Sequence, residues 1–363
     1  MNILFLNASI PNYLIDGLFH GLRSLTDITV VDVPRMDYMY EDASVEDLQK
    51  TGSRGNTLYK ILPEEKQIRG KRTYWLADIE KYDHIIFTDI FEQCDLFNYI
   101  YKSLRKEKRS RISIIDGYDS SSRFPFFHNS FNLKVRPWSY FYNFNNVNVF
   151  KREFENTGEL YGIRKGSFPV LNKIASKILS IPSRQYKISM SIPESHIENI
   201  SFKNKTQDFI NYNIDDELNE IFNELPVAEA GVWKPSFEKQ EDYYNDIKNS
   251  KFGITTRRLG WDCLRHYEYA AKGAILCFKN LEQKNEICAP FGLDETNCIP
   301  YTTKDDLLFK IKSKTIGELE GIQKNQYEWI RRYTTKNVAK DFLLHLSNIR
   351  EVPKRTVVDF RFW

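Results

Sequence analysis

Short apolar runs alternate with amphipathic helical stretches, and this alternation is what most constrains the fold of the chain. Residues 2–6 and 28–33 have the composition of buried strands. Between them Tyr13 to Leu25 is a predicted helix that places its leucines on one face. A strand, a helix and a second strand in succession predict a parallel sheet, because parallel strands need a crossover connection.

The same pattern continues along the chain, with further predicted strands at residues 84–88, 112–115 and 146–150. Each of these strands is followed at once by polar or charged residues, as expected for a doubly wound sheet whose functional groups gather at the C-terminal edge. A second cycle of strands and helices starts near Lys187. The sequence therefore predicts an α/β protein with two Rossmann-like domains that face a central cleft.

The expected boundary separates an N-terminal domain, residues 1–175, from a C-terminal domain, residues 176–340. A C-terminal helix and tail, residues 341–363, are expected to pack back on the N-terminal domain. The chain of 363 residues is long enough for two domains of ordinary size.

Composition excludes several classes of protein. The net charge of +3 argues against a dedicated nucleic-acid binder, which usually presents a strongly basic face. The five cysteines are scattered and odd in number, which favours reduced thiols in a cytoplasmic protein. We expect no signal peptide, no membrane span and no metal site. The basic segment 102–111 is either a solvated surface or a peripheral contact with the inner membrane face.

The segment from Lys251 to Phe278, KFGITTRRLGWDCLRHYEYAAKGAILCF, predicts a strand, a loop, a helix and a strand. A basic turn at a helix N-terminus suits a diphosphate, because free amides and the helix dipole favour an anion there. Arg265 can reach a phosphate, and Glu268 lies one turn further along the same face, where a carboxylate can accept from two ribose hydroxyls. The alternative is a surface ion pair on a capped helix. The candidate donor-binding residues are Arg257, Arg258, Gly260, Trp261, Asp262, Arg265 and Glu268.

This segment resembles the donor-site signature of GT-B-fold glycosyltransferases, in particular the bacterial "glycosyl transferases group 1". The shared pattern R-x-x-E-x-x-A-x-G corresponds to Arg265, Glu268, Ala271 and Gly273. Segments 115–119, 149–154, 249–254 and 291–308 are also similar to segments of that group. The resemblance implies that the N-terminal domain, residues 1–175, is the acceptor domain and that a nucleotide-sugar donor binds the C-terminal domain. It places Glu268 on the ribose and Arg265 on the diphosphate. Many retaining members carry a second glutamate where this chain has Gly260, so the resemblance does not assign retention.

The catalytic base is expected in the turn that follows the strand at 112–115. Asp116 and Asp119 are the candidates, since an acceptor hydroxyl must lose its proton to a nearby base. The alternative is an Asx-turn that only holds the loop. Asp89 is a weaker candidate of the same kind, and His128 is expected to be a packed or surface residue. The aromatic stretch 124–150 is an acceptor platform, a lipid-facing surface or a wall of the core.

These observations together predict a hexosyltransferase that uses no cofactor. It would move a sugar from a nucleotide-diphosphate sugar to a hydroxyl of a glycan or a lipid-linked acceptor, as in polysaccharide biosynthesis. Metal independence is expected because the aspartate pairs at 215–216 and 305–306 precede predicted helices, where they cap. A non-catalytic nucleotide- or sugar-binding protein and a nucleotide-sugar epimerase of the GT-B type are the alternatives.

Overall fold

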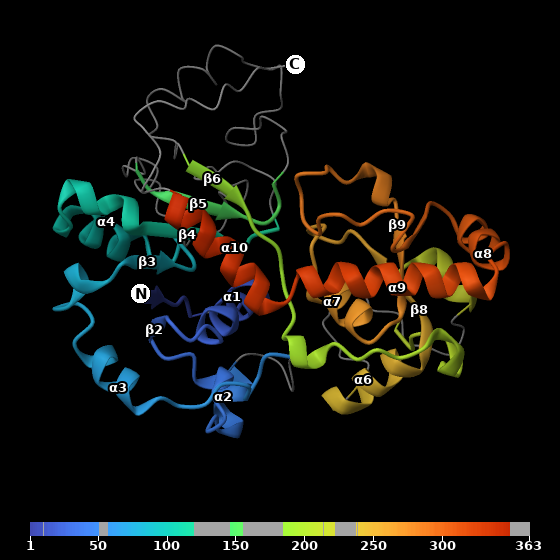
Figure 1. The fold of residues 1–363 in the computed structure, drawn as a ribbon, viewed down its shortest axis with the longest axis horizontal. Helices are drawn as coiled ribbons and strands as arrows, with labels where there is room; N and C mark the ends of the chain where they lie inside the picture. The colour runs from blue at the N-terminus through green and yellow to red at the C-terminus, as the bar shows by residue number, and fades with distance from the viewer. Residues whose placement is uncertain are drawn as a thin grey trace, which may run out of the picture.

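Two parallel sheets lie side by side in the computed structural model, and they confirm the predicted α/β class (Figure 1). The first sheet has six strands in the order β2-β1-β3-β4-β5-β6, and the second has four in the order β10-β9-β8-β7. The structure describes residues 1–9, 11–50, 57–119, 146–154, 184–212, 214–221, 237 and 239–348. The expected boundary at residue 175, His128 and most of the aromatic stretch 124–150 lie outside these residues.

The first sheet is built around β1, whose strand residues are buried apart from the first. β1 pairs with β2 on one side and with β3 on the other, so that Leu4 lies opposite Val31 and Ile85. Alternate side chains face opposite sides: Ile3 and Phe5 pack in the cluster that holds α1, and Leu4 and Leu6 in the cluster that holds α4. The elements are β1 Asn2–Leu6, α1 Tyr13–Arg23, β2 Thr29–Val33, β3 His84–Phe87, α4 Cys94–Ser103, β4 Ile112–Asp116, β5 Asn148–Lys151 and β6 Arg184–Lys187.

The polar stretch between β2 and β3 forms short elements that cover the edge of the first sheet. These are η1 Asp37–Met39, α2 Val45–Lys50, α3 Lys66–Thr73 and η2 Ile79–Lys81. Arg72 of α3 binds the buried carboxylate of Asp32 on β2 at 2.7 Å, and Tyr40 donates to the same carboxylate at 2.9 Å. A buried charge thus ties this irregular segment to the sheet.

The second sheet is smaller and carries helices on both faces. Its elements are β7 Gln207–Phe209, α6 Gln240–Asn249, β8 Ser250–Thr256, α7 Leu264–Ala271, β9 Ile275–Lys279, β10 Ile299–Tyr301, α8 Lys304–Lys312, α9 Ile316–Arg332 and α10 Thr335–Asn348. The remaining 3₁₀ helices of the described chain are η3 Lys106–Arg111, η5 Glu194–His196, η6 Phe202–Asn204, η7 Asp216–Ile221 and η8 Leu281–Gln283. β6 belongs to the first sheet although it follows the expected boundary.

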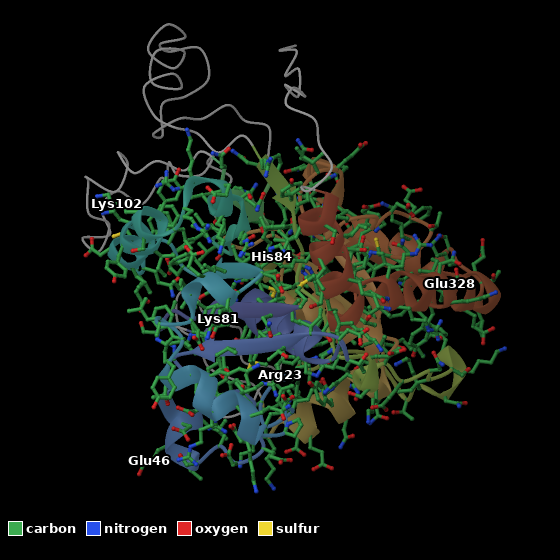
Figure 2. All side chains as sticks on the ribbon, turned by 60° about the vertical axis from the view of Figure 1, so that its left-hand side comes forward. Arg23, Glu46, Lys81, His84, Lys102 and Glu328 are labelled. Carbon is green, nitrogen blue, oxygen red and sulfur yellow. The ribbon has the colours of Figure 1, made fainter. Side chains whose placement is uncertain are left out.

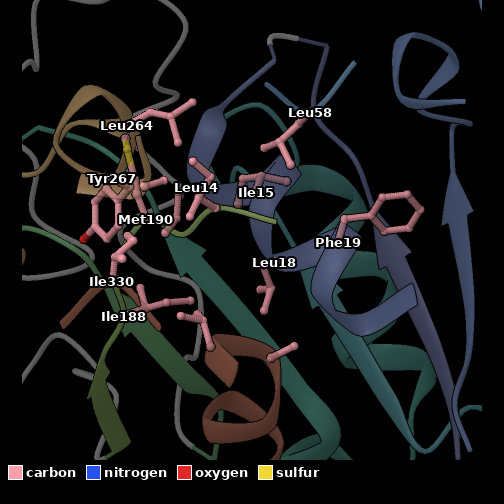
Figure 3. Close-up of a cluster of buried hydrophobic side chains, with 14 of the residues drawn as sticks. Leu14, Ile15, Leu18, Phe19, Leu58, Ile188, Met190, Leu264, Tyr267 and Ile330 are labelled. Carbon is pink, nitrogen blue, oxygen red and sulfur yellow. The ribbon is translucent and has the colours of Figure 1, made fainter. Parts of the chain in front are cut away.

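α10 returns from the second half and packs on α1 of the first (Figure 1). The approach is so close that a Cβ on Gly21 would lie 1.9 Å from the carbonyl oxygen of Thr335, so only glycine fits there. One apolar cluster also joins the two halves, and Figure 3 shows Leu14 of α1 beside Leu264 and Tyr267 of α7. The two sheets therefore share a continuous buried core.

Within the described residues no helix is long and apolar enough to cross a membrane. Several cations of the basic segment 102–111 are bound by the protein itself: Lys108 pairs with Glu80, and Arg111 donates to the carbonyl oxygen of Tyr82 at 3.0 Å. Lys102 is exposed at the periphery of the molecule (Figure 2). A peripheral membrane contact of this segment stays a prediction.

Candidate functional site

The predicted strand, loop, helix and strand of residues 251–278 are confirmed as β8, α7 and β9 with a loop between the first two. α7 begins at Leu264 after Cys263 at the N-cap, and no side chain caps it. Asp262 lies just before this helix and is fully used in other contacts. The carboxylate of Asp262 accepts from the amide of Met190 and from the hydroxyl of Tyr267, both at 2.8 Å. The helix ends before Gly273, which has φ of +71° and sits against Tyr327.

Glu268 lies in the middle of α7 with only 9% of its surface exposed. One carboxylate oxygen accepts from the hydroxyl of Tyr243 at 2.8 Å, and the other accepts from the hydroxyl of Thr57. Burial raises the pKa of Glu268, while these two hydroxyls and the charge of Arg265 oppose the rise. Hydroxyl groups from both halves of the chain thus hold the carboxylate predicted to bind ribose.

Arg265 lies one turn before Glu268 and carries a buried guanidinium whose Nε and Nη2 have no hydrogen-bond partner among the described residues. Its charge rests over the ring of Tyr212 at 5.5 Å. The hydroxyls of Tyr269, on the same helix, and of Thr255, at the end of β8, are likewise buried and unpartnered in the described structure. Buried donors normally have acceptors, so this group of donors is suited to an anion with several oxygens.

The other predicted donor-binding residues lie in the loop before α7, and some are exposed whereas others are buried. Arg257 and Arg258 are exposed, and Arg257 rests over the ring of Trp261 at 5.1 Å. Trp261 and Asp262 are buried, and their amides donate to the carboxylate of Glu153 at 3.0 and 2.9 Å. These two backbone amides therefore hold an internal carboxylate in this structure.

Gly260 has a steric reason for being glycine. A Cβ there would lie 2.6 Å from a carboxylate oxygen of Glu153 and 2.8 Å from one of Asp119. A glutamate at this position would clash with both and add a third carboxylate to them. Many retaining members have a glutamate where this chain has Gly260. The packing of Glu153 and Asp119 against this loop explains why a larger residue does not fit here.

Asp116 and Asp119 both make ion pairs with residues at the end of β5. Asp116 is buried, binds Lys151 at 2.8 Å and accepts from the amide of Tyr118 at 3.3 Å, as in the Asx-turn alternative. Asp119 pairs with Arg152, which also donates to the carbonyl oxygen of Asp262. Asp119 therefore lies at the junction of the two halves, and a catalytic role for either aspartate stays a prediction.

Sequence reasoning missed the residues that reach the site from other parts of the chain, namely Thr57, Tyr243 and Glu153. It also missed His266, which is fully buried against Phe278 with neither ring nitrogen bonded to a described residue. Burial and the charge of Arg265 lower the pKa of His266 far below its usual value. Among the described residues no group of three or more His, Cys, Asp or Glu side chains could hold a metal ion.

Comparison with known proteins finds no matching family model and no curated relative. Among solved structures, a glycosyltransferase from Rickettsia africae aligns with a TM-score of 0.50 at 9% identity, over 97% of this chain and 99% of that one. HepE from Anabaena in complex with UDP-glucose aligns with a TM-score of 0.50 at 10% identity, over 96% and 100%. The chain has a GT-B fold. A second structure of HepE, with UDP and glucose, gives the same TM-score at 11% identity.

Proposed function

We propose that this protein is a glycosyltransferase that moves a hexose from a nucleotide-diphosphate sugar to a hydroxyl of a glycan or lipid-linked acceptor. The observation that carries the proposal is the pair formed by Glu268 and Arg265 on α7. One is a buried carboxylate bound by two hydroxyls, and the other is a buried guanidinium with unpartnered donors. The GT-B fold and the UDP-glucose in a HepE structure support uridine diphosphate as the nucleotide to test first.

Glu268 is suited to the ribose because two hydroxyl groups already occupy its two oxygens. Ribose would present its own pair of hydroxyls to the same carboxylate and would replace those of Thr57 and Tyr243. The exchange keeps every hydrogen bond of the carboxylate, so the buried charge stays paired. Tyr243 and Thr57 would then be free to contact other parts of the donor.

Arg265 is suited to the diphosphate because its guanidinium is buried and still has donors to give. A charge held in a protein interior interacts with an anion more strongly than it would in water. The dipole of α7 adds to the same effect. The charge that develops on the leaving diphosphate would be stabilised by these groups, which supports transfer without a metal ion.

The proposal is tested by measuring the affinity for UDP with calorimetry. We expect Glu268→Ala and Arg265→Ala each to weaken binding about 10- to 100-fold, the loss expected for a hydrogen bond to a charged group. Glu328→Ala, which removes an exposed carboxylate of α9, is the matched control and should bind as the unchanged protein does (Figure 2). Equal affinity in all four proteins would refute the donor site.

Measurements of donor turnover distinguish a transferase from a non-catalytic binding protein and from an epimerase. A transferase should release UDP from UDP-glucose faster when an acceptor is added, and should do so in the presence of a chelator. Binding without UDP release under any acceptor would favour the non-catalytic protein. Conversion of the donor sugar with no acceptor present would favour the epimerase. Loss of activity in chelator, restored by Mn²⁺, would contradict metal independence.

A further inference from the structure

A cavity of about 310 Å³ lies at the C-terminal edge of the six-stranded sheet, within the size range of small-molecule sites. Its walls come from the segments that follow β1, β2, β3 and β4 and from the start of α1. The residues that matter here are Asn12, Arg35, Asp37, Tyr38, Asp89 and Tyr118. In a doubly wound sheet this edge is where ligands bind.

The cavity adjoins the loop that precedes α7. Tyr118 lines it, and the carboxylate of the next residue, Asp119, would be only 2.8 Å from a Cβ on Gly260. Asn12 lines it from the other side and is followed by Tyr13, whose pKa is raised by burial first and also by nearby groups that include the carboxylate of Glu268. A molecule in the cavity would therefore lie next to a donor held by α7.

The charges around the cavity disfavour an anionic ligand. Arg35 is the cation among the described lining residues, and three carboxylates already neutralise it: Asp37 at 2.7 Å, Asp42 at 2.5 Å and Glu64 at 2.8 Å. The carboxylates of Asp37 and Asp89 also line the cavity. A phosphate or uronate would meet a surplus of negative charge, whereas sugar hydroxyls could donate to these carboxylates.

Two features fit a sugar in particular. Tyr118 is 39% exposed and its ring stands edge-on to that of Phe91 at 5.4 Å, which gives the cavity an aromatic rim. Asp89 is half-buried, with one oxygen accepting from the hydroxyl of Tyr118 at 2.6 Å and the other from the amide of Phe91 at 2.9 Å. The second oxygen also accepts from the amide of Glu92 at 3.3 Å. The oxygen bonded to Tyr118 has a further lone pair, so Asp89 can still accept a proton from a bound hydroxyl.

We propose that this cavity is the acceptor site, that it binds an uncharged sugar, and that Asp89 is the base. The inference rests on the proposed function, which it deepens. The acceptor O–H bond breaks and its proton passes to the carboxylate of Asp89. The acceptor oxygen forms the bond to the anomeric carbon, and the bond from that carbon to the diphosphate breaks, so the nucleoside diphosphate leaves with the electron pair. Asp116, buried in its ion pair with Lys151, is less available for this step.

Binding is tested first, by saturation-transfer NMR on the full chain with UDP present. The probes are methyl glycosides of glucose, galactose, mannose and N-acetylglucosamine, each beside the corresponding 6-phosphate at the same concentration. We expect signals from at least one methyl glycoside, weaker signals from its phosphate, and loss of both in Tyr118→Ala. No signal from any methyl glycoside, stronger signals from the phosphates, or signals unchanged in Tyr118→Ala would overturn the acceptor site.

The base is tested by UDP release from UDP-glucose with the glycoside that binds best. Asp89→Asn should lower kcat at least 100-fold while leaving the affinity for UDP and the NMR signals of the glycoside in place. Asp78→Asn, at an exposed ion pair with Lys81, is the control and should turn over normally. A kcat of Asp89→Asn within threefold of the unchanged protein would overturn the base. Absence of UDP binding would instead refute the donor site, so the two failures are distinguishable.

Discussion

Asp16 shows how an individual side chain can lower the stability of this fold. It is fully buried in α1, and one carboxylate oxygen accepts from the hydroxyl of Tyr38 at 2.6 Å. The other oxygen has no partner among the described residues. Burial raises the pKa of Asp16 to about 7, above the ordinary value of the unfolded chain. The folded protein therefore holds this proton while the unfolded chain releases it, so stability falls as the pH rises from about 4 to 7.

Asp16→Asn should relieve this penalty, because the amide keeps an acceptor for Tyr38 and carries no charge. We expect the free energy of unfolding at pH 8 to rise by about 1–3 kcal/mol relative to the unchanged protein, and the gain to shrink at pH 5, where the carboxyl stays protonated in the fold. Urea unfolding at both pH values measures the difference. A variant that is less stable than the unchanged protein at pH 8 would contradict this account.

Residues of the site could be predicted from sequence where the contact is local. Arg265 and Glu268 are one helical turn apart, so periodicity alone places them on one face. Thr57 is separated from Glu268 by 211 positions in the sequence, and Glu153 from Asp262 by 109, and no local pattern encodes such contacts. The ion pairs of Asp116 and Asp119 could not be predicted for the same reason, because their partners lie at the end of the neighbouring strand β5.

At the scale of elements, the ends of α6 and α7 are held together by one buried lysine. The ammonium of Lys205 donates to the carbonyl oxygens of Lys248 at 2.9 Å and Lys272 at 3.1 Å, near the C-termini of these two helices. A cation is favoured there by both helix dipoles. Burial lowers the pKa of Lys205 to about 8, so it is largely charged at neutral pH.

Lys205→Met should leave those carbonyl groups buried without a donor. We expect a loss of about 2–3 kcal/mol in the free energy of unfolding, the range for hydrogen bonds to a charged group. Lys203→Met, two residues earlier with its side chain 64% exposed, is the matched control and should change stability by less than about 0.5 kcal/mol. Thermal unfolding at pH 7 compares the three proteins, and equal midpoints would rule out this role for Lys205.

Elements with strong apolar periodicity were predictable, and those that depend on their neighbours were not. β1, α1 and β9 are apolar enough to be assigned alone. β6 has the sequence RQYK and is a strand because it pairs in register with β5 at the edge of the sheet. The elements between β2 and β3 are likewise held by contacts of Arg72 and Tyr40 with Asp32. No local sequence pattern predicts these contacts.

At the scale of the whole molecule, the two halves are joined by an apolar core and by a few polar contacts. The amides of Trp261 and Asp262 in the second half hold Glu153 of the first, and Thr57 of the first half holds Glu268 of the second. Under the proposed function, groups that would meet the donor's ribose also fasten the halves together. Donor binding and the contact between the halves are then linked, because the ribose and Thr57 compete for one carboxylate.

Protonation of two half-buried histidines should weaken the whole molecule at acidic pH. His20 on α1 bonds Thr335 of α10 at 2.8 Å, and burial lowers its pKa to about 4. Burial also lowers the pKa of His196 to about 4. The unfolded chain takes up these protons near pH 6.5 and the fold does not, so the stability they contribute is present above that value and is lost as the pH falls toward 4.

His20→Gln tests this linkage, because the amide can still bond Thr335 but cannot take up a proton. Between pH 6 and 4.5 the free energy of unfolding of the unchanged protein should fall more steeply than that of the variant, by about 1.4 kcal/mol per pH unit, the slope of one proton. Urea unfolding across this range measures both slopes. Asp16 titrates in the opposite sense over part of this range and is present in both proteins, so it cancels in the comparison. Parallel slopes would show that His20 does not contribute to the acid response, and the contact of α10 with α1 would then be independent of pH.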